Sequence, residues 1–444
     1  MRYISNTPDI CAAMLRDLGL SSIEELFASI PEAVRLPGPL DIPPAQTEPE
    51  LLAWFAARGE ENGGIEAQPS FLGGGTYRHH IPSLIPHLAT RPEFQTTYTP
   101  YQPEFSQGTL RAIYEFQTLM CQLTGLEVSN ASLYDGSTAL AEAVLMAWRL
   151  QKRARRVWVS RAVHPEYREV LATYSRHIDL ELVELPVDPA TGRTDLAALR
   201  ADAETAAVVL QSPNFFGVVE DLAGVKGRIE GSPALFVVAV TEPLSLGLLK
   251  PPGAFGADIV CGEAQSFGLP PTYGGPFCGF LTTRDAYRRQ IPGRLAGETV
   301  DADGTRGFVL ALATREQHIR REKATSNICT NQNLCALMVT IYLSLLGRTG
   351  LRRLAAINAR LAHHLKTELA RVPGVSIPCS GPTFNEFVFQ TERECLPALE
   401  AAGLLGPIPL VRWYPDRPDQ YLCCVTECVS RGDLDRFLEV LRSC

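Results

Sequence analysis

Short apolar runs recur along the chain from about residue 70 to residue 320. They are Val157–Val159, Leu180–Leu185, Ala206–Leu210, Leu235–Val240, Asp258–Cys261 and Gly279–Leu281. Amphipathic stretches with helical spacing accompany them, Ala139–Gln151 before the first run and Pro165–Tyr174 after it. Strands buried on both faces are apolar at nearly every position, and their alternation with helices is typical of parallel sheets. The pattern therefore predicts an α/β fold with a mostly parallel sheet in a large domain of residues 70–320.

The first 69 residues have a different pattern, which predicts an N-terminal helical arm and linker. Asn6–Asp9 is a helix-start signal ahead of apolar residues at helical spacing, and a second short helix with a serine cap is expected from Ser21. Pro37–Pro49 is rich in proline and is expected to be an extended linker. We expect this arm to lie over another surface.

The last part of the chain, residues 321–444, is expected to hold a linking helix and a small C-terminal α+β domain. Residues 316–349 form a long, mostly helical stretch in the prediction. A helix at Leu351–Arg371, strands at Phe384–Gln390 and Tyr421–Val425 and a helix at Asp433–Leu441 follow.

Composition is that of an ordinary globular enzyme, with 45% hydrophobic and 20% charged residues among 444 and a net charge of -8. Such a charge does not attract nucleic acid or an anionic membrane. No 18-residue uncharged apolar run and no signal-peptide pattern are present, so we expect a cytoplasmic protein with no membrane partner. The twelve cysteines are scattered and are expected to be reduced thiols. The adjacent pairs His79–His80 and His363–His364 do not have metal-ligand spacing, so no metal site is predicted.

Two segments suggest an anion or ligand site beside the sheet. Gly136, Ser137 and Thr138 begin a long helix, where free backbone N–H groups can hold a phosphate. The alternative is that Asp135 or Ser137 simply caps the helix, and the charge of Asp135 opposes a phosphate. His164 follows a strand, so it faces the usual ligand crevice of an open α/β sheet or hydrogen-bonds at a helix start.

Two further segments extend this arrangement. Glu242 ends an apolar strand, where an acid can pair with a cofactor ring nitrogen or can simply be solvated. Gln265 and Ser266 follow the strand at Asp258–Cys261. The order of the four segments resembles that of fold-type I pyridoxal-phosphate enzymes, which have an aspartate aminotransferase-like fold. In that resemblance a lysine attaches the cofactor after the last strand.

That lysine is missing from the sequence. The matching position is Ser266, or at best Gln265, and no lysine lies between Lys250 and Lys323. Without an amine the cofactor cannot be attached, so we expect Gly136, Ser137, Thr138, His164, Glu242, Gln265 and Ser266 to form a vestigial cofactor pocket.

Several longer stretches make the resemblance specific and extend it over nearly the whole chain. They resemble glycine dehydrogenase (decarboxylating), the P-protein of the glycine cleavage system, in the N-terminal half of its long form or subunit 1 of its split form. These stretches are Tyr98–Glu104, Gln107–Leu110, Tyr134–Glu142, His164–Arg168, Pro292–Leu295, Thr299–Asp301, Gly307–Phe308, Arg315–Gln317, Ile319–Arg321 and Ala324–Thr330.

The resemblance implies a subunit of a heteromeric, pyridoxal-phosphate-dependent glycine decarboxylase. Glycine loses carbon dioxide, and its aminomethyl group passes to the oxidised lipoyl arm of H-protein, which is reduced. The implied partners are a lysine-bearing P-protein subunit 2, lipoylated H-protein and the other components of the glycine cleavage system. Pyridoxal phosphate is then bound covalently by the partner subunit, and no catalytic residue is assigned to this chain.

A polar loop at residues 96–108 is stiffened by two prolines and is expected to line a shared active site. The residues expected there are Tyr98, Tyr101, Gln102, Glu104 and Gln107, with Asn327 from a second polar cluster. A subunit-contact loop and a helix cap are the plain alternatives. Gly73–Gly75 either lets the backbone approach a ligand closely or acts as a hinge.

Two other functions compete with the subunit hypothesis. The chain could be a stand-alone pyridoxal-phosphate enzyme of the aminotransferase or cysteine desulfurase type that uses Lys250 or Lys323. It could also be a pseudo-enzyme that only scaffolds its partner.

Overall fold

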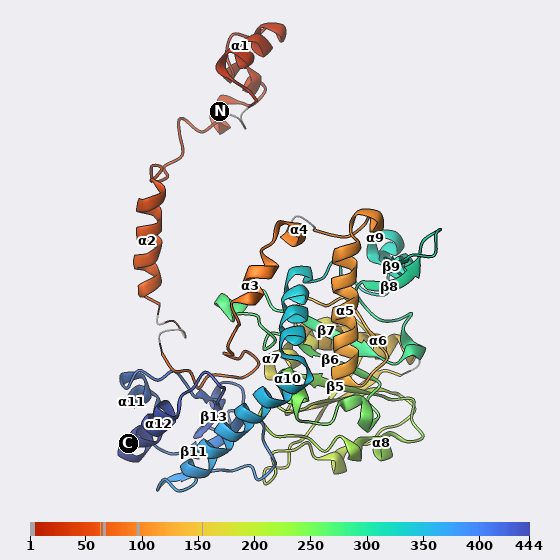
Figure 1. Ribbon diagram of the computed structural model, residues 1–444, viewed down its shortest axis with the longest axis vertical. Coiled ribbons are helices and arrows are strands. Elements are labelled where there is room, and N and C mark those ends of the chain that lie inside the picture. The colour runs from red at the N-terminus through yellow and green to blue at the C-terminus, as the bar shows by residue number, and fades with distance from the viewer. Residues whose placement is uncertain (1–4, 63, 65–67, 96–97, 153) are drawn as a thin grey trace. The chain divides into compact units, whose positions relative to one another are not determined.

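The computed structural model describes residues 5–62, 64, 68–95, 98–152 and 154–444, and divides the chain into two compact units, residues 1–63 and 64–444 (Figure 1). The first unit contains helices α1 (Pro8–Asp17) and α2 (Glu48–Glu60), with short 3-10 turns η1 (Glu24–Phe27) and η2 (Glu32–Val34). None of its described residues is buried. The helix start at Thr7 is confirmed, because its side chain accepts a hydrogen bond from the Ile10 amide at 3.4 Å.

The second short helix predicted for this unit is a single 3-10 turn instead. The Ser21 hydroxyl is bonded to Glu25 and does not cap a longer helix. Sequence analysis also missed α2, in which the Thr47 amide donates to the Glu50 carboxylate at 2.9 Å. The proline-rich segment hides this start, because its last proline stands inside the first turn of α2, where a proline is tolerated.

A seven-stranded sheet in the order β1-β7-β6-β5-β4-β2-β3 forms the centre of the second unit. Its strands are β1 (Val128–Ser129), β2 (Arg156–Ser160), β3 (Glu181–Leu185), β4 (Thr205–Gln211), β5 (Leu235–Val240), β6 (Ile259–Glu263) and β7 (Gly279–Thr283). The strands from β3 to β6 are parallel, whereas β7 and β1 pair antiparallel. The prediction of a mostly parallel α/β sheet is confirmed, and each predicted run coincides with a strand.

Both faces of this sheet are covered, which explains why its strands are apolar throughout. On β5, Phe236 and Val238 pack into one core cluster, and Val237 and Ala239 pack into another. The first cluster includes residues of helices α5 (Gln107–Thr124) and α10 (Asn333–Leu369). The second includes residues of α6 (Gly136–Leu150) and α7 (Pro165–Ser175). The shorter helices of this unit are α3 (Leu84–Ala89), α4 (Pro92–Gln95), α8 (Ala223–Ile229) and α9 (Gln317–Arg320).

A four-stranded antiparallel sheet in the order β10-β11-β13-β12 forms the C-terminal part. Its elements are β10 (Val375–Ser376), β11 (Glu386–Thr391), α11 (Leu396–Ala401), β12 (Ile408–Pro409), β13 (Gln420–Cys424) and α12 (Arg431–Ser443). The expected α+β pattern is present here. The helical stretch predicted at 316–349 is only partly right, because residues between α9 and α10 form a turn and an irregular segment.

Helix α10 connects the two sheets and bends at Gly347, whose φ is +58°. Among the described helices it is the one that length and composition would allow to cross a membrane. It packs against α3, α5 and β11, and Val339 and Tyr342 lie in the core, as in the central helix of a globular domain.

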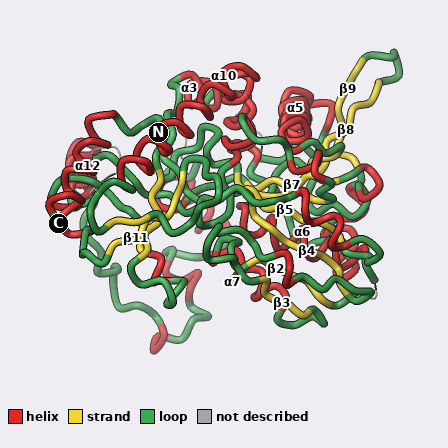
Figure 2. Tube along the Cα trace, turned by 90° about the horizontal axis from the view of Figure 1, so that it is seen from below, coloured by secondary structure: helices red, strands yellow, loops and turns green. Residues whose placement is uncertain are grey.

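A two-stranded hairpin, β8 (Leu295–Val300) and β9 (Arg306–Ala311), projects from the large sheet region (Figure 2). Two glutamines of α5 hold it. Gln117 accepts from the Ala296 N–H at 2.8 Å and donates to the Ala296 carbonyl at 3.0 Å. Gln107 pairs with the Phe308 N–H at 2.8 Å and the Phe308 carbonyl at 2.9 Å. An amide side chain thus pairs with each strand as a neighbouring strand would.

We predict that Gln117→Leu destabilises the protein by about 1 to 3 kcal/mol, because it leaves the Ala296 N–H and carbonyl without partners. Urea unfolding would measure the change, and hydrogen exchange at Ala296 would place it in the hairpin. Gln122→Leu on the same helix is the control, because Gln122 is exposed. Equal effects of the two substitutions would refute a specific role for Gln117.

Candidate functional site

Two carboxylates of the chain itself hold the N-terminus of α6. The Gly136 N–H donates to Glu263 Oε2 at 2.9 Å. Asp135 Oδ1 accepts from the Thr138 N–H at 2.8 Å and from the Ser137 hydroxyl at 2.6 Å. Of the two interpretations of this segment, the helix cap by Asp135 is the one the structure contains. Glu263 and Asp135 therefore take the N–H and hydroxyl donors that a phosphate at this helix start would need.

Glu263 is buried and accepts two more backbone N–H groups, from Ala264 at 3.0 Å and Cys278 at 2.8 Å. Burial raises the pKa of Glu263 to about 7, although these N–H donors oppose the rise. The sequence analysis did not single out Glu263. A carboxylate at the end of a fully apolar strand was the available signal.

His164 lies against the glycine-rich segment, and the contact involves the backbone of that segment. Its Nε2 is 2.6 Å from the Gly74 carbonyl, so Nε2 carries the proton, and Nδ1 accepts from the Glu166 N–H at 3.2 Å. A Cβ on Gly75, whose φ is +101°, would lie 2.9 Å from His164 Nε2. The glycines therefore allow a close approach to a side chain of this chain. Burial lowers the pKa of His164.

Glu242 pairs with His79 in the interior. His79 Nε2 lies 3.0 Å from Glu242 Oε2, and His79 Nδ1 lies 2.9 Å from Glu427 Oε2. Because both ring nitrogens face carboxylates, the ring is a doubly protonated imidazolium. Asn385 donates to Glu242 and Asn358 to Glu427, at 3.0 and 2.9 Å.

The charges of this cluster are strongly coupled. Burial alone would lower the pKa of His79, but the two carboxylates outweigh burial and raise it to about 10. Burial alone would raise the pKa of Glu427, but the hydrogen bonds and charge of His79 lower it to about 2. The cluster joins the end of β5 to the turn after β13 and to α10, so it connects the two sheets.

The position that matches the cofactor-binding lysine is buried in this chain. Ser266 is buried, and its hydroxyl has no hydrogen-bond partner in the described part of the chain. Gln265 bonds the Tyr77 backbone in both directions, at 2.9 and 3.0 Å. One continuous segment therefore packs against the predicted pocket. In it, Gly74 contacts His164, Tyr77 contacts Gln265, and His79 contacts Glu242.

A second cluster surrounds the buried Arg294, which is 3% exposed. Its guanidinium donates to the hydroxyls of Thr99 and Tyr101 at 3.2 Å, to Thr330 at 3.1 Å and to the Cys329 carbonyl at 3.2 Å. The polar loop at residues 96–108 and the segment around Thr330 therefore meet at the Arg294 guanidinium. Sequence analysis quoted Arg294 in a motif and gave it no role.

The predicted lining residues differ in how they are placed around this cluster. Tyr98 is 83% and Tyr101 60% exposed, and Gln102, Glu104 and Asn327 are also exposed. Gln107 instead points to β9, where its amide holds the hairpin. A pocket of about 580 Å³ lies beside the cluster and is lined by Phe94, Gln95, Tyr98, Thr109, Ala112, Thr330, Asn331, Gln332, Asn333, Leu334 and Leu337. Residues 96 and 97 of the predicted loop lie outside the described residues.

Comparison with known proteins decides the family. The family described as "Glycine cleavage system P-protein" matches residues 1–441. The chain belongs to the P-protein family. A "Probable glycine dehydrogenase (decarboxylating) subunit 1" of Geobacillus kaustophilus is 49% identical over 99% of this chain and 98% of its own. A protein of that name from Anaeromyxobacter dehalogenans is 51% identical over 100% of both.

Solved structures agree with the P-protein assignment and with the fold. A crystal structure of "glycine decarboxylase (P-protein) of the glycine cleavage system, in inhibitor-bound form" matches with a TM-score of 0.92 and 45% identity over 100% of both chains. A Burkholderia pseudomallei sphingosine-1-phosphate lyase matches at 0.66 with 15% identity over 93% of this chain and 94% of its own. The latter shows the fold alone. The fold is the fold-type I pyridoxal-phosphate fold that the sequence predicted.

The residues of this P-protein chain do not fit a covalently held pyridoxal phosphate. Ser266 supplies no amine, Glu263 takes the Gly136 N–H, Glu242 is paired with His79, and the backbone of Gly74 touches His164. A pocket of about 430 Å³ remains beside them. Its acidic lining residues Asp135, Glu166 and Glu263 oppose a phosphate there.

We predict that His79→Gln lowers the free energy of unfolding by about 3 to 5 kcal/mol near pH 6, because Glu242 and Glu427 lose their cation. The folded pKa of His79, about 10, lies above the unperturbed 6.5. Its contribution is therefore complete below pH 6.5 and declines as the pH rises toward 10. The difference from the wild type should shrink between pH 6 and pH 9.

Urea unfolding at both pH values measures this difference. The exposed His177→Gln is the matched control and should change stability by less than about 0.5 kcal/mol. A constant difference across the pH range would show that His79 is not held as an imidazolium.

Proposed function

We propose that this chain is the non-lysine subunit of a two-subunit glycine decarboxylase that releases carbon dioxide from glycine and passes the aminomethyl group to the lipoyl arm of H-protein. In this proposal a lysine-bearing subunit holds pyridoxal phosphate covalently. The observation that carries the proposal is the interior of the cofactor-like pocket, where Glu263, Glu242 and His164 are already paired within the chain.

The contribution of this chain is then a polar surface for the partner's active site. Arg294 holds the hydroxyl groups of Thr99, Tyr101 and Thr330 together, and Tyr101 is exposed at the edge of this cluster. Tyr98, Gln102, Glu104 and Asn327 are exposed nearby in sequence and are proposed to face the same site. A preorganised polar wall orients a substrate without movement of its own groups during the reaction.

A stand-alone enzyme is less consistent with the geometry. Lys250 is exposed and lies over the Phe255 ring at 5.1 Å, and Lys323 is exposed on a turn. Neither residue lines the pocket beside His164 and Glu263. A lysine that attaches a cofactor needs a place in that pocket.

We predict that this chain alone does not exchange bicarbonate carbon into glycine, even with lipoylated H-protein and pyridoxal phosphate, and shows no Schiff-base absorbance band. Adding the lysine-bearing subunit should produce the exchange. That subunit alone is the control for activity that does not need this chain. Exchange or a Schiff-base band from this chain alone would overturn the proposal.

We further predict that Arg294→Lys lowers kcat/KM of the mixed enzyme about tenfold to a hundredfold, because the three N–H groups of one ammonium cannot replace the four hydrogen bonds that the planar guanidinium makes to Thr99, Tyr101, Thr330 and Cys329. Most of the change should appear in kcat if the wall acts in the transition state. Sedimentation should show unchanged assembly. Arg306→Lys, at an exposed ion pair with Glu298, is the control. Loss of assembly with a normal kcat would show that Arg294 only supports the subunit contact.

A further inference from the structure

The cavity of about 430 Å³ beside the start of α6, called the α6 cavity below, has an acidic lining. Asp135, Glu166 and Glu263 contribute carboxylates to it, and none of the described lining residues is a lysine or an arginine. His164 brings no positive charge, because burial lowers the pKa of its ring and its Nε2–H is donated to the Gly74 carbonyl. Three carboxylates without a basic side chain among them give the cavity a negative potential.

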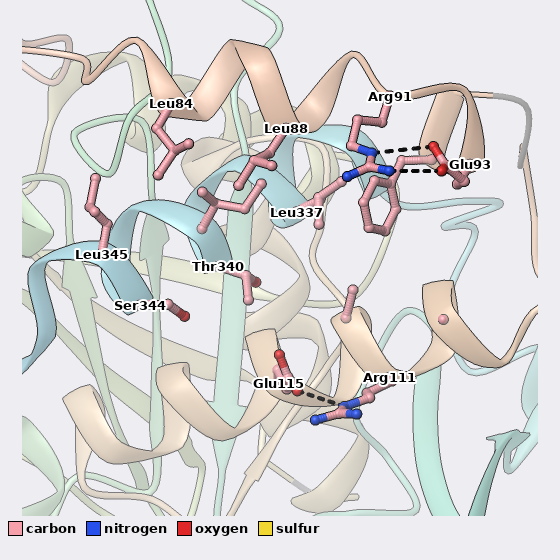
Figure 3. A pocket seen from close by; sticks show the side chains of 14 residues that line it. Leu84, Leu88, Arg91, Glu93, Arg111, Glu115, Leu337, Thr340, Ser344 and Leu345 are labelled. Carbon is pink, nitrogen blue, oxygen red and sulfur yellow. Dashed lines mark hydrogen bonds and ion pairs between the residues drawn. The ribbon is translucent and has the colours of Figure 1, made fainter.

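The wider groove between α3, α5 and α10, with a volume of about 720 Å³, has the opposite arrangement (Figure 3). Arg91 pairs with Glu93 at 3.0 Å, and Arg111 pairs with Glu115 at 2.9 Å. The charged groups that line this groove therefore balance one another. An excess of carboxylates is thus a property of the α6 cavity and not of every hollow in the chain.

A buried hydroxyl without a partner also lies in the α6 cavity. Tyr167 of α7 is 8% exposed, and its hydroxyl makes no hydrogen bond within the described part of the chain. The hydroxyl lies against Gly136, because a Cβ at that position would collide with it. It is therefore at the first turn of α6, where the Glu263 carboxylate also lies. Buried polar groups normally have a partner, so a bound ligand is the group that would complete this hydroxyl.

Aromatic rings form much of the wall of the α6 cavity. Tyr134, Tyr167 and Phe277 line it together with Val170. The His164 ring lies against Tyr167, with centroids 4.9 Å apart and 32° between the ring planes. Aromatic faces attract cations and pack against flat apolar groups. The volume of the cavity is within the usual range for small-molecule sites, roughly 300 to 1,000 Å³.

We propose that the α6 cavity binds a small organic cation, a protonated amine carried on a flat apolar body. The ammonium group donates to the Tyr167 hydroxyl beside Glu263 and Asp135, and the apolar body packs on the rings. A metal ion is a poorer occupant, because no group of three His, Cys, Asp or Glu side chains in the described ranges is arranged to hold one. Every lining group belongs to this chain, so the site can be tested without a partner and apart from glycine decarboxylation.

Glu263 couples the binding of a cation to pH. Burial raises its pKa to about 7. The titratable groups that interact with it are Asp135, Tyr167, Cys278 and Cys335, and burial keeps the last three neutral by raising their pKa. A bound cation favours the ionised carboxylate, so below pH 7 a proton must leave Glu263 when the cation binds. The dissociation constant of a cation should therefore fall about tenfold between pH 6 and pH 8.

Isothermal titration calorimetry of the full chain at pH 8 with benzylamine, benzyl alcohol and benzoate tests the proposal, because these probes share a ring and differ in charge. Benzylamine should bind about tenfold more tightly than benzyl alcohol, and benzoate should not bind. Tyr167→Phe removes only the unpartnered hydroxyl, so it should weaken benzylamine binding about tenfold and leave the melting temperature unchanged. Tyr174→Phe on the same helix is the control, because Tyr174 is 38% exposed and does not line the cavity.

Each other result contradicts a defined statement. Equal binding of benzylamine and benzyl alcohol would show an apolar hollow that does not select charge. Tighter binding of benzoate would show an anion site. Benzylamine binding that is unchanged in Tyr167→Phe would place the cation elsewhere on the chain, and a dissociation constant that is the same at pH 6 and pH 8 would remove Glu263 from the site. Binding of none of the three probes would overturn the proposal as a whole.

Discussion

The paired charges at His79 are the interaction on which the arrangement of the second unit depends. One imidazolium meets a carboxylate from the large sheet and another from the small sheet, with α10 supplying an amide to the second. The two carboxylates raise the pKa of the buried His79 ring, and the ring in turn lowers the pKa of Glu427. The relative position of the two sheets is thus coupled to a protonation state. The same ring keeps Glu242 from meeting any added ligand.

The strands of the large sheet were predictable because they are buried on both faces and are therefore apolar at nearly every position. The run Leu235–Val240 is apolar on both faces because helices cover both faces, and its sequence shows this directly. Helix α5 was missed because its buried face includes the polar residue Gln117. The side-chain amide of Gln117 bonds the backbone of Ala296 in the hairpin, a role that the local sequence does not indicate. The β8–β9 hairpin was missed for the related reason that its stability comes from α5, far away in sequence.

The vestigial cofactor pocket stays a prediction, and the structure shows how its residues are paired within the chain. The order of Gly136, His164 and Glu242 pointed to one pocket, and the missing lysine pointed to a lost attachment. The pairings involve Glu263 and Glu427, two acids at or after apolar strands, and that position alone does not reveal which groups they bond. Arg294 was in the same position, because its role depends on two loops that meet only in the folded chain.

The self-paired pocket also has an evolutionary consequence. A fold-type I chain can lose its lysine by a single substitution, but regaining a lysine at position 266 would not restore a cofactor site. Glu263 would still hold the α6 amide, His79 would still hold Glu242, and the Gly74 carbonyl would still touch His164. Several separate changes would have to occur together, each harmful alone because it exposes a buried polar group. In the two-subunit enzyme proposed above, these pairings would keep this chain dependent on its lysine-bearing partner.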